Sequence, residues 1–416
     1  MPKMNWLKHR LFALISPLVE IIHNACSAEY RVKKVRAKAE DGDVDAQILL
    51  GMWYVSGDLV GQDFFEAVKW LKMAAMHGDN RAHLAIGMLY EHGLGVEQDY
   101  VEAAKWYRPV AEHGDVRLQF LLGTLYATGR AGVKDHCEAA KWYHMAAAQG
   151  HIGAQSVLGA YYYGGLGVKR DPTEAVKWWH KAAMKGDKMA QFELGECYAK
   201  GDGVSQNWRE AIKWWQKSAK HGYAKAQCKL GKCYTDGCCV KKSLLTATKW
   251  WSRAANQGFS EAQFYLGRCY EKGTGVRRDY SQAVKWYLKA AEQSYADAQY
   301  SLGGFYITGL SVTRDFKKAI EWFKKAAEQG HAEAQYSLAL CFRTSEYECQ
   351  NLDEAAKWFN KAALQGHTKA QYNLGVCYSK GDGVEKDFKQ AVKWYLAAAR
   401  GGDPDAREAI DAIAHT

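Results

Sequence analysis

Residues 258–293 read GFSEAQFYLGRCYEKGTGVRRDYSQAVKWYLKAAEQ, and this stretch decides the fold. Its first half places apolar side chains at i, i+4 and i+8, on one face of an α-helix: Ala262, Leu266 and Tyr270. Two turn glycines follow, Gly273 and Gly275. The second half spaces its apolar side chains at i, i+3 and i+7: Ala283, Trp286 and Ala290. The stretch therefore predicts helix, turn, helix.

The same pattern recurs from residue 42 to residue 401 with a period of 36 and without insertion or deletion, which gives ten repeats. The tryptophan of the second helix is present in every repeat: Trp70, Trp106, Trp142, Trp178, Trp214, Trp250, Trp286, Trp322, Trp358 and Trp394. A glycine also recurs inside the first helix, as Gly267 does, although mid-helix glycine costs about 1 kcal/mol relative to alanine. This recurrence predicts a helix–helix contact too close for a side chain.

The repeat pattern predicts an all-α solenoid of ten 36-residue helix–turn–helix repeats. The chain has only 5 prolines, which favours a high helix content. Its 39 glycines are then expected at the ends of helices. Residues 1–41 form a basic segment before the repeats, and residues 402–416 begin one more helix and stop. We interpret the latter as a C-terminal capping helix, because terminal repeats of such arrays need a cap.

The consensus A-Q-x-x-L-G-x-x-Y-x-x-G-x-G-V-x-x-D-x-x-x-A-x-x-W-x-x-x-A-A-x-x-G resembles the Sel-1-like repeat, a relative of the tetratricopeptide repeat. The resemblance covers residues 42–401. It implies a right-handed α/α superhelix that serves as an adaptor or scaffold for other proteins. It names no single partner, because a fold alone does not define a function.

The open face of the first helix in each repeat is the candidate binding groove. With Ala46, Leu50 and Tyr54 in the core, positions 49, 52 and 56 and their equivalents are expected to point away from it. These positions are apolar in early repeats and charged in the middle ones. The candidate groove residues are Leu49, Met52, Met88, Leu121, Glu193, Glu196, Lys229, Lys232, Arg268 and Lys272.

Charge and motifs narrow the class of function. The net charge of +10 is spread thinly beyond residue 41, so we expect a protein or peptide partner and no nucleic acid. No phosphate-binding loop, dinucleotide-binding or hydrolase motif occurs, so we expect no cofactor and no enzyme activity. The leading hypothesis is a cytoplasmic, monomeric scaffold. The alternatives are an exported bacterial factor that engages a host or envelope protein, and an enzyme with an unrecognised site.

Two further columns follow the period. A lysine precedes the tryptophan in nine repeats, and in six of them a glutamate lies three residues earlier, which predicts an ion-paired outer face. Repeat eight reverses the signs, with Lys318 and Glu321.

The other column contains Cys197, Cys233, Cys269, Cys341 and Cys377, where other repeats place apolar residues. These cysteines are expected to be buried apolar side chains rather than metal ligands. Cys238 and Cys239 suggest redox sensitivity or no role.

The N-terminal segment leaves three interpretations open. Lys3, Lys8 and Arg10 precede an apolar run, Leu11–Val19, and Cys26-Ser27-Ala28 resembles a cleavage site. The segment is then a cap or docking helix on repeat one, an export signal, or a membrane-surface contact. The 11 cysteines, most of them at core positions, favour a reducing compartment and therefore the cytoplasm.

Overall fold

The computed structural model describes residues 28–344 and 350–414, with side chains through residue 410. Every regular element in these ranges is an α-helix. The chain forms two compact units, Met1–Ala211 (unit 1) and Ile212–Thr416 (unit 2), and the division falls within one helix, α12 (Trp208–Lys220). The all-α repeat solenoid predicted from the sequence is confirmed.

Each repeat contributes two helices, which we name helix A and helix B. The helices A are α3 (Val44–Ser56), α5 (Asn80–His92), α7 (Val116–Thr128), α9 (Ile152–Gly164), α11 (Lys188–Lys200), α13 (Ala224–Asp236), α15 (Ser260–Lys272), α17 (Ala296–Thr308), α19 (Ala332–Arg343) and α21 (Thr368–Lys380). The helices B, besides α12, are α4 (Phe64–Ala75), α6 (Tyr100–Glu112), α8 (His136–Ala148), α10 (Pro172–Met184), α14 (Leu244–Asn256), α16 (Tyr280–Glu292), α18 (Phe316–Glu328), α20 (Leu352–Leu364) and α22 (Phe388–Arg400).

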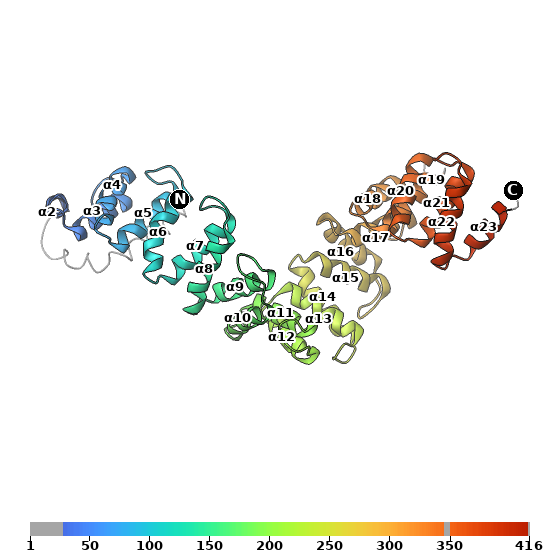
Figure 1. The fold of residues 1–416 in the computed structure, drawn as a ribbon, viewed down its shortest axis with the longest axis horizontal. Helices are drawn as coiled ribbons and strands as arrows, with labels where there is room; N and C mark the ends of the chain where they lie inside the picture. The colour runs from blue at the N-terminus through green and yellow to red at the C-terminus, as the bar shows by residue number, and fades with distance from the viewer. Residues whose placement is uncertain (1–27, 345–349, 415–416) are drawn as a thin grey trace. The chain divides into compact units, whose positions relative to one another are not determined.

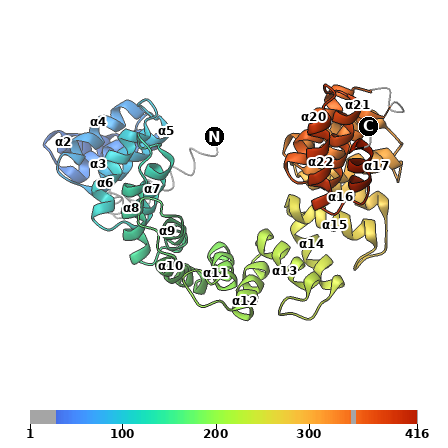
Figure 2. The ribbon, with the colours of Figure 1, turned by 45° about the vertical axis from the view of Figure 1, so that its right-hand side comes forward.

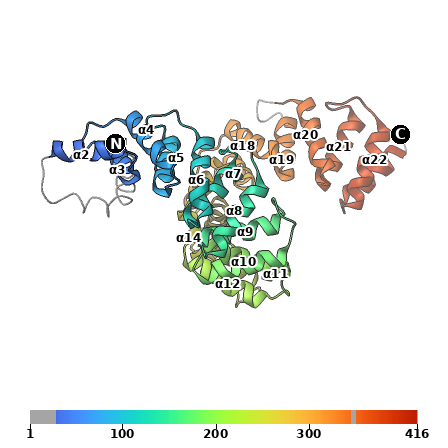
Figure 3. The same cartoon turned by 60° about the vertical axis from the view of Figure 1, so that its left-hand side comes forward.

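Within each unit, every helix packs against the next one along the chain. In unit 1 this holds from α2 (Ala28–Glu40) to α11 (Figure 1). In unit 2 it holds from α13 to α23 (Asp405–Ala414); Figure 2 shows α13, α14 and α15 in succession, and Figure 3 shows α19 to α22. The packing is local in sequence, as expected of a repeat array whose units bury their apolar faces against neighbours.

Local signals set the helix ends. The carboxylate of Asp279 accepts a hydrogen bond from the Gln282 backbone N–H at 3.0 Å, which makes Asp279 the N-cap of α16. Gly273 ends α15 in the left-handed region, with φ of 71°, and its N–H donates to the Cys269 carbonyl. Gly258, just beyond α14, has φ of 88°. Glycine suits both positions because it lacks the Cβ that disfavours this conformation.

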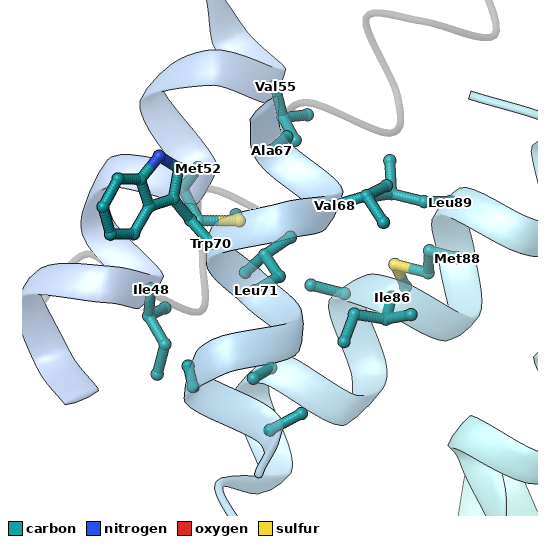
Figure 4. Packing of buried hydrophobic residues seen from close by; sticks show 14 of the residues in the cluster. Ile48, Met52, Val55, Ala67, Val68, Trp70, Leu71, Ile86, Met88 and Leu89 are labelled. Carbon is teal, nitrogen blue, oxygen red and sulfur yellow. The ribbon is translucent and has the colours of Figure 1, made fainter. Parts of the chain in front are cut away.

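The core of the first repeats is built from three successive helices, and it corrects part of the predicted groove. Figure 4 shows Leu71 of α4 among Ile48 and Met52 of α3 and Ile86 and Met88 of α5. Leu49, Met52 and Met88 are only 2%, 4% and 6% exposed, so the prediction that they point away from the core is wrong. Leu121 is half-buried and packs against the same core. Apolar side chains at these positions in the first repeats are therefore part of the hydrophobic core.

The mid-helix glycines mark close helix crossings, as predicted. A Cβ placed on Gly267 of α15 would lie 2.8 Å from Cδ1 of Tyr287 and 3.3 Å from the carbonyl oxygen of Ala283, both on α16. A real Cβ does not approach an aromatic carbon so closely. The glycine thus gives up helix propensity so that the ring of the next helix can lie on its backbone.

A ladder of buried glutamines connects neighbouring repeats. The side-chain amide of Gln263 in α15 donates to the Ala255 carbonyl at the end of α14, at 3.3 Å. Its Oε1 accepts from Gln293, at the end of α16 in the same repeat, at 2.8 Å. The same Gln–Gln bond recurs from Gln149, Gln257, Gln329 and Gln365. Where His77 or Lys185 replaces the donor glutamine, the buried Oε1 of Gln47 or Gln155 has no partner.

Replacing Gln293 with alanine is expected to destabilise unit 2 by about 1–3 kcal/mol, because it leaves the buried Oε1 of Gln263 without a donor. The matched control is His77→Ala, at the equivalent position beside Gln47. Its effect is expected to stay within about 0.5 kcal/mol, since no Gln–Gln bond exists there to lose. Urea unfolding of both variants measures the difference; equal effects would show that the ladder contributes nothing.

The ends of the array are helical. Helix α2 buries Val35 and Ala39, and the Ala39 carbonyl accepts from the side-chain amide of Gln47 at 3.1 Å. This is the bond that helix B makes in later repeats, so α2 occupies the helix-B place before repeat one. The apolar run Leu11–Val19 and the motif before Ala28 lie outside the described residues. At the other end, α23 packs against α22 and buries Ala406.

Candidate functional site

The predicted groove positions of repeats six to eight line two neighbouring hollows in unit 2. The first hollow has a volume of about 370 Å³ and lies between α13 and α15, above α14. Helix A supplies most of its wall, and three of the predicted residues belong to it: Lys232, Arg268 and Lys272. The hollow therefore unites candidate residues that are up to 40 positions apart in the sequence.

The wall of the first hollow combines aromatic rings with cations. The rings of Trp251 and Tyr265 stack, with centroids 4.9 Å apart and planes inclined by 13°. The Arg268 guanidinium lies 5.9 Å from the Tyr265 ring centroid, and the Lys232 ammonium lies 5.2 Å from it. A planar apolar surface bordered by positive charge can hold an apolar side chain and a neighbouring carboxylate together.

Two acidic side chains, Glu261 and Asp236, reduce the positive charge of the first hollow. The Lys232 ammonium lies 2.5 Å from Oε1 of Glu261. Burial lowers the pKa of Lys232, but the hydrogen bond and the charge of Glu261 outweigh it and hold the pKa above its ordinary value. Asp236 also lines the hollow. Arg268 and Lys272, both exposed, supply the outward-facing cations at this place.

The second hollow, of about 590 Å³, continues from the first. Lys272 lines both hollows. The second hollow is also lined by the groove-face residues Ser301, Gly304 and Thr308 of α17. Tyr300 and Phe323 contribute aromatic rings to its wall. The small side chains of repeat eight leave the space that bulkier residues fill in repeats one and two. The two hollows together extend across three consecutive helices A of unit 2.

The remaining predicted residues lie elsewhere. Glu193 and Glu196 belong to α11 of unit 1, where both are half-buried and Oε2 of Glu196 lies 3.8 Å from the Lys200 ammonium. Lys229 is half-buried in unit 2, with its ammonium 4.9 Å from the Trp215 ring centroid. None of these three residues lines the two hollows of unit 2 described above.

Sequence reasoning missed the aromatic part of the site. Tyr265 occupies the same repeat position as Leu49 and Lys229, so the period alone could have placed it in the groove. Trp251 and Thr248 come from helix B, whereas the predicted groove was confined to helix A. Thr248 donates from Oγ1 to the Leu244 carbonyl at 2.9 Å and lies 3.1 Å from the Thr274 carbonyl.

The ion-paired outer face is confirmed for five repeats. The lysine ammonium lies near the glutamate three residues earlier in the pairs Lys69–Glu66 (3.5 Å), Lys105–Glu102 (2.5 Å), Lys141–Glu138 (3.2 Å), Lys177–Glu174 (2.8 Å) and Lys357–Glu354 (2.9 Å). Repeat eight differs from the prediction, because Lys318 pairs with the N-cap residue Asp315 at 3.5 Å rather than with Glu321.

The cysteine column is buried, as predicted. Cys197, Cys269 and Cys377 are each no more than 3% exposed. Burial raises the pKa of the Cys197 thiol to about 12 and that of Cys377 to about 11, which keeps both thiols protonated at neutral pH. No disulfide joins the cysteines of the described ranges, and no group of three or more potential metal ligands forms there.

No helix within residues 28–344 and 350–414 is both long and apolar enough to cross a membrane.

Comparison with known proteins places the repeats in a family. The model described as Sel1 repeat matches ten consecutive segments: residues 44–79, 80–115, 116–151, 152–187, 188–223, 224–259, 260–295, 296–331, 332–367 and 368–403. No curated protein is significantly similar to the chain.

Two solved structures are similar over most of their length. One is c5321 of uropathogenic Escherichia coli, described as a protective antigen with an SLR fold; it is 34% identical, with a TM-score of 0.74, and the match covers 98% of this chain and 89% of that one. The other is a Sel1 repeat protein of Oxalobacter formigenes, 34% identical with a TM-score of 0.57, where the match covers 74% of this chain and 89% of the other.

Proposed function

Because the chain belongs to the Sel1 repeat family, we propose that it is a scaffold that holds an acidic segment of a partner protein along the helix-A face of repeats six to eight. Sel1 repeats are generally non-enzymatic scaffolds for protein–protein interaction. The observation that carries the proposal is the pair of adjoining hollows, whose aromatic walls are bordered by Arg268 and Lys272.

The geometry suits an extended segment rather than a single small ligand. The two hollows share Lys272 and continue from α13 to α17, so neighbouring side chains of one segment can occupy both. The half-buried Tyr265 ring, stacked on the buried Trp251, offers area to an apolar side chain at little cost in conformational entropy. Arg268 and Lys272 then select carboxylates on the same segment, because opposite charges across an interface set specificity.

The test combines photocrosslinking with charge reversal. A photoreactive phenylalanine analogue replaces Thr235, which lines the first hollow, and crosslinked partner peptides from native cells are sequenced by mass spectrometry. In the double variant Arg268→Glu/Lys272→Glu, the crosslinked yield is expected to fall at least tenfold, since two attractive charges become repulsive.

The control variant is Lys225→Glu/Lys369→Glu, which makes the same charge change at exposed helix-A residues outside both hollows. It is expected to retain the crosslink. If both double variants lose the crosslink equally, or if the crosslinked peptides carry no excess of Asp and Glu, the proposed site is wrong. Melting temperatures of the variants check that the fold is intact.

A further inference from the structure

The helices B of unit 2 carry a strong excess of positive charge. Five of them, α14, α16, α18, α20 and α22, contain 13 Lys and Arg against 5 Asp and Glu. The four helices B that lie wholly in unit 1 contain 7 against 5, and the helices A of unit 2, α13 to α21, contain 8 against 5. The excess of positive charge is therefore confined to the helices B of unit 2.

The charges are arranged in pairs one helical turn apart. Four of the five helices present two exposed cations at i and i+4: Lys249 and Arg253, Lys285 and Lys289, Lys357 and Lys361, and Lys389 and Lys393. Like charges at this spacing repel each other by a few tenths of a kcal/mol. The arrangement thus lowers helix stability slightly unless an anion lies between the two cations.

In unit 1, a glutamate three residues earlier neutralises the lysine that precedes the tryptophan. Three helices B of unit 2 lack this glutamate. In α4, α6, α8 and α10 a glutamate three residues before the lysine forms the ion pairs described above. In α14, α16 and α22 that position is occupied by Thr246, Gln282 and Gln390. The positive charge of these helices is therefore available to a partner.

The tryptophan column fixes the second cation of several pairs. The Arg253 guanidinium lies 4.7 Å from the Trp250 ring centroid. The ammonium groups of Lys289 and Lys361 lie 4.3 Å and 3.7 Å from the rings of Trp286 and Trp358. A cation held over a ring loses less side-chain entropy when it binds an anion, since its rotamer is already restricted.

We propose that this cationic face, defined as Lys249, Arg253, Lys285, Lys289, Lys361 and Lys393, binds the phosphodiester backbone of nucleic acid. Within a helix, the Cβ atoms of the two paired cations lie about 6 Å apart, and the helices B that carry such pairs alternate with helices A along unit 2. A cation pair that recurs at the same helix-B positions in four of the five repeats suits a polymer with uniformly spaced phosphates better than a folded protein, whose charges do not repeat. The expectation of no nucleic acid rested on charge averaged over the whole chain, which concealed this face.

The probe is a fluorescein-labelled 30-nucleotide oligodeoxythymidylate, whose binding to the full chain is followed by fluorescence anisotropy between 50 and 200 mM salt. The variant Lys249→Gln/Arg253→Gln/Lys285→Gln/Lys289→Gln is expected to bind at least tenfold more weakly than wild type at 50 mM salt. The slope of log K against log salt should shrink by about 0.7 for each phosphate contact that is lost.

The matched control removes the same number of charges from the lysines that precede the tryptophan in unit 1: Lys69→Gln/Lys105→Gln/Lys141→Gln/Lys177→Gln. It should bind as wild type does, because those lysines are paired with glutamates. Equal loss in both variants would overturn the proposal, since net charge alone would explain it. So would no binding at 50 mM salt, or displacement of the oligonucleotide by polyglutamate or phosphatidylglycerol vesicles at equal charge concentration. Circular dichroism confirms folding.

Discussion

Replacing Tyr107 with alanine is expected to destabilise unit 1 by about 3–5 kcal/mol, as truncation of a buried aromatic residue commonly does. Tyr107 of α6 is 1% exposed, and its ring lies on the backbone of Gly87 in α5. Because Gly87 has no side chain, it cannot move into the space that the ring leaves. Urea unfolding measures the loss as a lower midpoint.

The control for this prediction is Tyr107→Phe, which keeps the ring. It removes the hydroxyl, which donates a hydrogen bond to Oε2 of Glu91 at 2.5 Å, and is expected to cost about 1 kcal/mol. Hydrogen exchange of α5 and α6 amides reports where the damage lies, since repeat arrays can unfold locally. Equal destabilisation by alanine and phenylalanine would show that the ring packing contributes little.

Replacing Gly303 with alanine is expected to destabilise unit 2 by about 1–3 kcal/mol, although alanine is the better helix former. The added Cβ would lie 2.4 Å from Cδ1 and Cε1 of Phe323, and this buried ring on α18 has little room to move. Overpacking of this kind forces the backbone or the ring to shift. The melting temperature of the variant is expected to fall accordingly.

The neighbouring residue provides an internal control. Gly304 lies in the same helix α17, but a Cβ there would have no atom within 4 Å. Gly304→Ala is therefore expected to stabilise the protein by about 0.5–1 kcal/mol through helix propensity alone. The opposite signs of two adjacent glycine substitutions make this test sharp: a gain at both positions would refute the close crossing of α17 and α18.

The sequence by itself determined the repeat architecture. A 36-residue period with fixed positions for tryptophan, glycine and the capping aspartate leaves one consistent solution, two helices per repeat stacked on their neighbours. It also determined the buried cysteine column, because a position that accepts Leu, Phe or Cys is apolar. The mid-helix glycines predicted close crossings for a similar reason, since only a contact explains their cost.

Only the tertiary structure decided which equivalent positions form a surface. Met52 and Arg268 hold the same place in their repeats, yet Met52 is buried and Arg268 lines a hollow. Periodicity gives the direction of a side chain from its own helix, but burial depends on how the residues of the next helices fill the space. Small residues such as Ser301 and Gly304 leave a hollow in repeat eight, whereas Leu49 and Met52 pack into the core of repeat one.

The helix-B faces of unit 1 and unit 2 also differ in the residues that surround each lysine. Periodicity placed a lysine before the tryptophan in nine repeats, but net charge could not show that acids balance these lysines in unit 1 and are missing beside Lys249 and Lys285 in unit 2. The cation–π contact of Arg253 with Trp250 depends on side-chain placement that no residue count contains. Sequence fixes what each repeat is made of, and packing between repeats decides which of its residues remain available to a partner.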